Sequence, residues 1–105
     1  MQTLTEIVQE VLERWILASR GESHDMFDLA DEVSQQFEES NIPMIYNAAI
    51  DALGILFHSG EVVSNSKRFI DKLEALTVDR LRILVSSPIE INIEEARFAQ
   101  KALGL

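Results

Sequence analysis

The fold depends on residues 61–76, EVVSNSKRFIDKLEAL, which are compatible with two structures. In the first, Val62 and Val63 form a strand and the polar residues after them turn the chain back, which gives a short hairpin. In the second, a helix begins at Ser64 or Ser66 and has one apolar face, made of Phe69, Ile70, Leu73 and Leu76. We favour the hairpin, followed by a helix that begins in the second half of the stretch.

Two amphipathic helices are expected at the start of the chain, because apolar residues recur there at intervals of three and four. The first helix begins at a capping box formed by Thr3 and Glu6 and stops at Gly21. The second begins at Ser23 or Asp25 and ends in a polar run. Their apolar stripes comprise Leu4, Ile7, Val8, Val11, Leu12, Trp15 and Ile16 in the first, and Met26, Leu29, Ala30, Val33 and Phe37 in the second.

A third helix is expected from Pro43 to Gly60, since proline suits the first helical position. Apolar residues cover nearly every direction around its axis, which predicts a central, buried helix. Its one polar track is spaced by four, three and four residues and consists of Asn47, Asp51, Gly54 and His58.

Beyond the ambiguous stretch, Thr77 is interpreted as the cap of a helix over 78–85, with leucines placed to form a hydrophobic staple across it. Pro88 breaks the chain before a short extended piece. Asn92 and Glu95 then form the capping box of a last helix.

In this order the chain resembles a winged-helix domain from Thr3 to about Ile70. Phe27 to Val33 is similar to that superfamily's second helix, and the turn near Asn41 is similar to the turn that follows it. Ile45 to Phe57 is similar to the third helix, and Gly60 to Val63 is similar to the first wing strand. The resemblance implies a mainly α fold with a small β-hairpin, a three-helix core over 1–70 and a helical extension over 71–105, all in one domain over 1–105. Such extensions often serve dimerisation, so we expect a homodimer.

Composition points to a folded globular protein, with 105 residues, 47% of them hydrophobic and 26% charged. The absence of cysteine excludes disulfides and thiol chemistry. The formal net charge is −9, and residues 1–63 contain twelve acidic and two basic residues, whereas residues 64–105 contain six acidic and seven basic ones. An acidic field of this kind repels phosphate backbones and favours basic partners. No signal peptide or membrane span is expected, which favours a cytoplasmic location.

These features favour a protein-interaction module, an adaptor or an inhibitor, that binds a basic protein surface. The expected partner-binding residues lie on the second and third helices and are Asp28, Asp31, Glu32, Tyr46, Asn47, Asp51 and His58. The alternative is a winged-helix transcriptional regulator that contacts DNA phosphates through Lys67, Arg68 and Lys72 at the wing. A further alternative is an acidic nucleic-acid mimic or immunity-type protein.

Catalytic and cofactor sites are not expected. The two histidines, His24 and His58, lack a third ligand with metal-site spacing. Adjacent carboxylates such as those of Asp31 and Glu32 point in different directions on a helix, and the four glycines stand singly, so the sequence contains no acid and base pair and no phosphate loop. We therefore expect no enzymatic activity, no metal and no cofactor.

Overall fold

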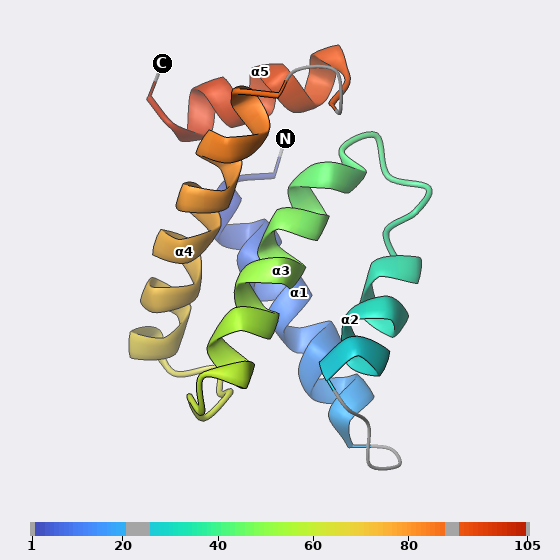
Figure 1. The fold of residues 1–105 in the computed structure, drawn as a ribbon, viewed down its shortest axis with the longest axis vertical. Coiled ribbons are helices and arrows are strands. Elements are labelled where there is room, and N and C mark those ends of the chain that lie inside the picture. Colours follow the sequence, from blue (N-terminus) through green and yellow to red (C-terminus); the bar gives the residue numbers. More distant parts are fainter. Residues whose placement is uncertain (1, 21–25, 88–90, 105) are drawn as a thin grey trace.

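The computed structural model describes residues 2–20, 26–87 and 91–104, which form five helices (Figure 1). The helices are α1 (Leu4–Ser19), α2 (Met26–Gln35), α3 (Pro43–His58), α4 (Lys67–Val85) and α5 (Ile93–Ala102). α3 lies between α2 and α4, α1 lies behind it, and α5 lies across the end of the bundle beside the N-terminus (Figure 1). The described residues contain no β-strand.

α3 is the centre of the core, as its apolar composition predicts. It packs against each of the other four helices. The fully or nearly fully buried residues on it include three small ones, Ala48, Ala49 and Ala52, which allow neighbouring helices to approach closely. Trp15 of α1 is also buried and its ring contacts that of Phe57 at a centroid distance of 6.0 Å.

Three predicted helix starts are confirmed. The Thr3 hydroxyl accepts a hydrogen bond from the Glu6 N–H at 3.2 Å, and the Glu6 carboxylate accepts one from the Thr3 N–H at 3.3 Å. Asn92 and Glu95 form the same reciprocal pair at the start of α5. Pro43 occupies the first turn of α3. These starts were predictable because each capping bond joins residues close together in sequence.

The predicted hairpin is wrong, and with it the winged-helix architecture, although the mainly α class is correct. Residues 61–65 contain no strand, and the Val62 side chain is 82% exposed. Ser66 instead caps α4, because its hydroxyl accepts a hydrogen bond from the Phe69 N–H at 3.3 Å. A helix from this point buries Phe69 and Leu73 in the core, which outweighs the weak extended preference of two adjacent valines.

The predicted cap at Thr77 is also wrong, since α4 runs without interruption from Lys67 to Val85. Thr77 is fully buried in the middle of this helix. Its hydroxyl donates a hydrogen bond to the Leu73 carbonyl oxygen at 2.7 Å, one turn earlier, so the side chain is satisfied inside the helix and does not end it. The apolar face of this single helix continues through Leu81.

Several predicted features lie outside the described residues. They are the helix stop at Gly21, the helix start at Ser23 or Asp25, His24, and the first two residues of the extended piece predicted at 89–91. None of the five helices described has the length and apolar character needed to cross a membrane.

Candidate functional site

Tyr46 forms a ring stack and hydrogen bonds with other residues of this chain. Its ring stacks on that of Phe37, with centroids 4.1 Å apart and an interplanar angle of 7°. Its hydroxyl donates to the Gln2 Oε1 at 2.7 Å and lies 3.4 Å from the Glu10 Oε2. Burial, together with the nearby Glu10 carboxylate, raises the pKa of the Tyr46 hydroxyl. The residue therefore joins α3 to the start of the chain and to the segment after α2.

Asn47 and Asp51 belong to the polar track of α3 and contact helices on opposite sides of it. The Asn47 carbonyl accepts a hydrogen bond from the Ser34 hydroxyl of α2 at 2.9 Å. The Asp51 carboxylate lies 4.0 Å from the Arg80 guanidinium of α4. Burial raises the pKa of Asp51, and Arg80 opposes that shift. Asp51 and Arg80 line a small hollow of about 240 Å³ between α3 and α4, to which the exposed Ile83 contributes an apolar edge.

His58 is exposed in the last turn of α3. It is two helical turns from Asp51 and more than three from Tyr46, at roughly 1.5 Å of rise per residue. The structure therefore brings Asn47 and Asp51 together at the hollow between α3 and α4, and neither Tyr46 nor His58 lines that hollow.

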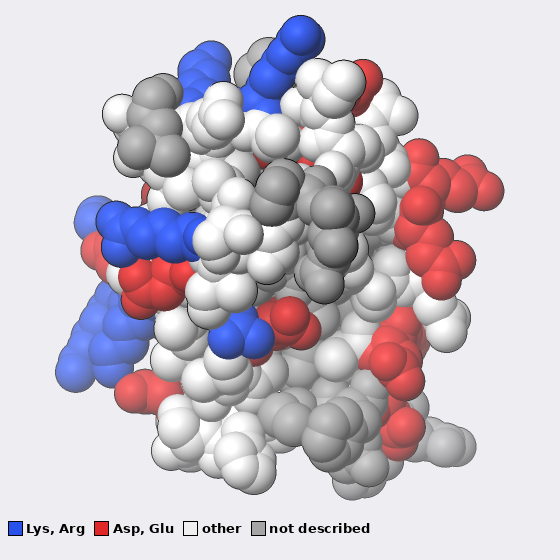
Figure 2. All heavy atoms as spheres, turned by 45° about the horizontal axis from the view of Figure 1, so that its top comes forward, with Lys and Arg blue, Asp and Glu red and all other residues white. Residues whose placement is uncertain are grey.

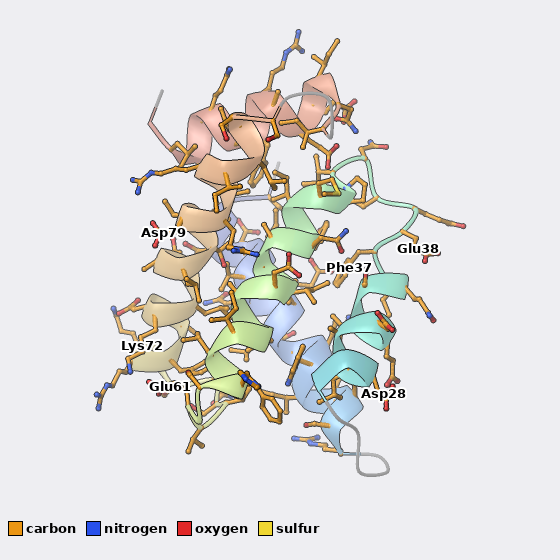
Figure 3. The ribbon with its side chains drawn as sticks, viewed as in Figure 1. Asp28, Phe37, Glu38, Glu61, Lys72 and Asp79 are labelled. Atoms are coloured by element: carbon orange, nitrogen blue, oxygen red, sulfur yellow. The ribbon has the colours of Figure 1, made fainter. Side chains whose placement is uncertain are left out.

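The predicted carboxylates of α2 do share one surface. Asp28, Asp31 and Glu32 are exposed on α2, whose Leu29 and Val33 are buried, and the turn after the helix adds the exposed Glu38 and Glu39. We call these five carboxylates the acidic face. Figure 3 shows Asp28 and Glu38 projecting outward at its two ends, and Figure 2 shows acidic side chains along this side of the molecule.

Ion pairs are found elsewhere in the described part of the chain. All four of them use a cation of α4: Lys67 with Asp71 at 3.0 Å, Lys72 with Glu61 at 2.9 Å, Arg80 with Asp51 at 4.0 Å, and Arg82 with Asp79 at 3.3 Å. By contrast, Asp31, Glu32, Glu38 and Glu39 form no ion pair or side-chain hydrogen bond with any described residue. These four negative charges of the acidic face are thus left without an ion pair among the described residues, whereas α4 pairs four of its own cations with nearby carboxylates (Figure 2).

An exposed apolar side chain adjoins the acidic face. A shallow hollow of about 220 Å³ between α1 and α2 is lined by Arg14, Leu17, Glu32 and two neighbours. Leu17 is 57% exposed, which is unusual for a leucine on a helix that buries most of its apolar residues. Arg14 is the one cation that lines this hollow, and it forms no ion pair with the described residues.

The cations of the DNA-binding alternative lie in the first turns of α4, where no wing exists. Lys67 and Lys72 are held by Asp71 and Glu61, and Arg68 is exposed beside them. Lys72 and Glu61 lie together at this end of the bundle in Figure 3. The Lys72 ammonium, through its hydrogen bond and its charge, lowers the pKa of Glu61 below its ordinary value of 4.5, and Arg68 adds to that shift.

Substituting Lys72 therefore changes the titration of Glu61. In Lys72→Gln we expect the pKa of Glu61 to return toward 4.5, as measured by NMR titration of its carboxyl carbon. Because the folded-state pKa is the lower one, this ion pair stabilises the wild type above the unfolded-state pKa, and the stabilisation disappears as the pH falls through the folded-state value. Lys67→Gln is the matched control, since Lys67 pairs with Asp71, and an equal rise in that variant would show that the general field of α4 causes the shift.

Glu95 has a structural role that the sequence shows only in part. Its side chain is 2% exposed, and one carboxylate oxygen accepts the capping hydrogen bond from the Asn92 N–H at 2.9 Å. The other oxygen accepts a hydrogen bond from the Met44 N–H, in the first turn of α3, at 2.6 Å. No side chain of the preceding residue caps α3, so Glu95 supplies an acceptor for two helix N-termini at once. The capping pattern predicted the first bond, and no local pattern indicated the second.

Comparisons with known proteins give no relative, because no family model, no curated protein and no solved structure matches the chain. The surfaces of the molecule are therefore the basis for its function. Of these, the acidic face has four exposed carboxylates, Asp31, Glu32, Glu38 and Glu39, without an ion pair or side-chain hydrogen bond to the described residues.

Proposed function

We propose that the protein is a non-enzymatic interaction module and that its acidic face binds a basic surface on a partner protein. The observation that carries this proposal is the contrast between α2 and α4. Four carboxylates of the acidic face have no ion pair or side-chain hydrogen bond with the described residues. On α4, by contrast, four cations each form an ion pair with a nearby carboxylate. Uncompensated charges of one sign attract a partner of the opposite sign.

The geometry of the surface is suited to a folded protein. α2 is about 15 Å long at the standard helical rise, so its carboxylates form a short, rigid array. Such an array raises the rate of encounter with a basic partner and favours one orientation of it. Leu17, exposed at the edge of the array, supplies apolar contact area of the kind that interfaces combine with a charged rim.

A protein partner is favoured over a nucleic acid by the same charges. A phosphate backbone would be repelled by the acidic face. The cations at the start of α4 offer little compensation, because Lys67 and Lys72 are already paired with carboxylates.

The proposal is tested by capturing partners from the native lysate with two sets of variants. Asp31→Asn, Glu32→Gln and Glu38→Gln together neutralise three charges of the acidic face. We expect this triple variant to recover its nuclease-resistant, stoichiometric partner about tenfold less well than the wild type, as measured by quantitative mass spectrometry.

A matched control separates position from net charge. Asn65→Lys, Ala75→Lys and Gln100→Lys are exposed substitutions that change the formal net charge of −9 by the same amount. The control triple variant should retain the partner. Equal loss in both triple variants, or equal retention in both, would contradict binding through the acidic face.

A further inference from the structure

A second surface, at the opposite end of α3 from His58, has a different chemistry. The side of α5, the segment before α3 and the start of the chain enclose an open groove of about 560 Å³. Ile42, Phe98 and the ring of Tyr46 form its apolar lining, and the neutral polar side chains of Gln2 and Asn41 line it as well. A volume of this size falls within the range of pockets that hold small molecules.

Two cations stand along one wall of this groove. Arg97 and Lys101 are separated by one turn of α5 and are both exposed. Neither forms an ion pair or a side-chain hydrogen bond with a described residue, although Glu94 lines the same groove and the whole chain is strongly acidic. Their charges are therefore available to an anion, and Figure 2 shows basic side chains at this end of the molecule.

The apolar lining continues past the cations. A smaller hollow of about 210 Å³ shares Gln2, Phe98 and Lys101 with the groove and adds the side chains of Leu4 and Ala102. The two hollows therefore share an apolar contact at Phe98 and a positive charge at Lys101. This arrangement is complementary to a molecule that has an apolar body and one anionic group.

We infer that the groove binds a small carboxylate with an apolar body. The body packs against Phe98 and Ile42, and the carboxylate accepts hydrogen bonds from Arg97 and Lys101. Asn41, in the segment before α3, lines the same groove. The site uses no residue of the acidic face, so this inference goes beyond the proposed function and does not depend on it.

The probe is 4-phenylbutyrate, with the uncharged 4-phenylbutan-1-ol as its comparison, titrated into the labelled full chain and followed by amide NMR spectra. For a ligand of this size we expect a dissociation constant of ~1 mM. Shifts should concentrate at residues 41, 42, 97, 98 and 101. The alcohol should bind about tenfold more weakly, because it cannot form the charged hydrogen bonds.

Two double variants test whether the positive charges of Arg97 and Lys101 are needed to bind phenylbutyrate. Arg97→Gln with Lys101→Gln should weaken phenylbutyrate binding about tenfold, and both positions are exposed, so the fold is retained. Lys67→Gln with Arg68→Gln removes the same charge at the other end of the bundle and should leave the affinity unchanged. Three results would overturn the inference: absence of localised shifts with phenylbutyrate, equal binding of the alcohol, or equal weakening in both double variants.

Discussion

Val78→Pro is expected to reduce the free energy of unfolding by about 3 kcal/mol or more, measured by urea denaturation. Val78 follows Thr77 in the middle of α4, where its N–H is part of the helical hydrogen-bond ladder. Proline removes that bond, and its ring clashes with the carbonyl one turn earlier. The result matters because the alternative boundary makes the opposite prediction. If Thr77 were an N-cap, residue 78 would be the first helical position, where proline is favourable.

Lys67→Pro is the matched substitution on the same helix. Lys67 is the first helical residue of α4, and Ser66 before it has an extended conformation, with φ −66° and ψ 149°, that proline tolerates in its predecessor. The variant loses only an exposed ion pair with Asp71, so its stability should remain within about 1 kcal/mol of the wild type. Equal stability of the two proline variants would contradict a continuous α4.

Glu95→Ala is expected to cost about 3 kcal/mol, which corresponds to a fall of roughly 10–20 °C in Tm. The substitution leaves the N–H groups of Asn92 and Met44 without their acceptor, at the junction where α5 meets α3. Hydrogen bonds to charged groups contribute about 1.5–3 kcal/mol each. Glu95→Gln keeps the shape and one acceptor oxygen, so its cost should be about half as large. In Glu95→Ala the Met44 amide should lose protection from hydrogen exchange.

Glu94→Ala is the control for Glu95, because Glu94 is the neighbouring carboxylate in the same first turn but is exposed. Its loss removes only a favourable interaction with the helix dipole, at a cost of about 0.5 kcal/mol. If Glu94→Ala and Glu95→Ala destabilised the protein equally, the general effect of acids at a helix N-terminus would explain both results, and Glu95 would have no special role in docking α5.

The features that the sequence predicts correctly depend on neighbours along the chain. The capping boxes of α1 and α5 each join residues three positions apart, and the amphipathic period of α1 identifies all six of its buried residues. The exposed carboxylates of α2 were predictable for the same reason, because they alternate with the residues that α2 buries.

The features that the sequence does not predict depend on packing between segments that are far apart along the chain. Val62 and Val63 favour a strand locally, but the free energy of the chain is lower when Phe69 and Leu73 enter the core on a helix. Thr77 resembles a cap until its hydroxyl is seen to bond to Leu73. The bond between Glu95 and Met44 spans 51 positions and leaves no local signal.

In the predicted interaction site, too, the exposed carboxylates of α2 were predictable from local sequence, and the contacts of Tyr46 were not. Asp31 and Glu32 were assigned to the outer face of α2 by periodicity, which needs no knowledge of the neighbouring helices. Tyr46 is predicted to be a partner-binding residue, whereas in the structure its hydroxyl donates a hydrogen bond within the chain, to Gln2. Its stacking on Phe37 depends on how α2 leads into α3, which the sequence does not show.

The most direct test of the proposed function is the association rate constant of the purified protein with its captured partner, measured by stopped-flow fluorescence as a function of ionic strength. Binding through the acidic face predicts that the wild type and the lysine control triple variant slow markedly as salt is added. The Asp31→Asn, Glu32→Gln and Glu38→Gln triple variant should start about tenfold slower and depend less on salt. A wild-type rate constant that does not change with ionic strength would contradict the proposal.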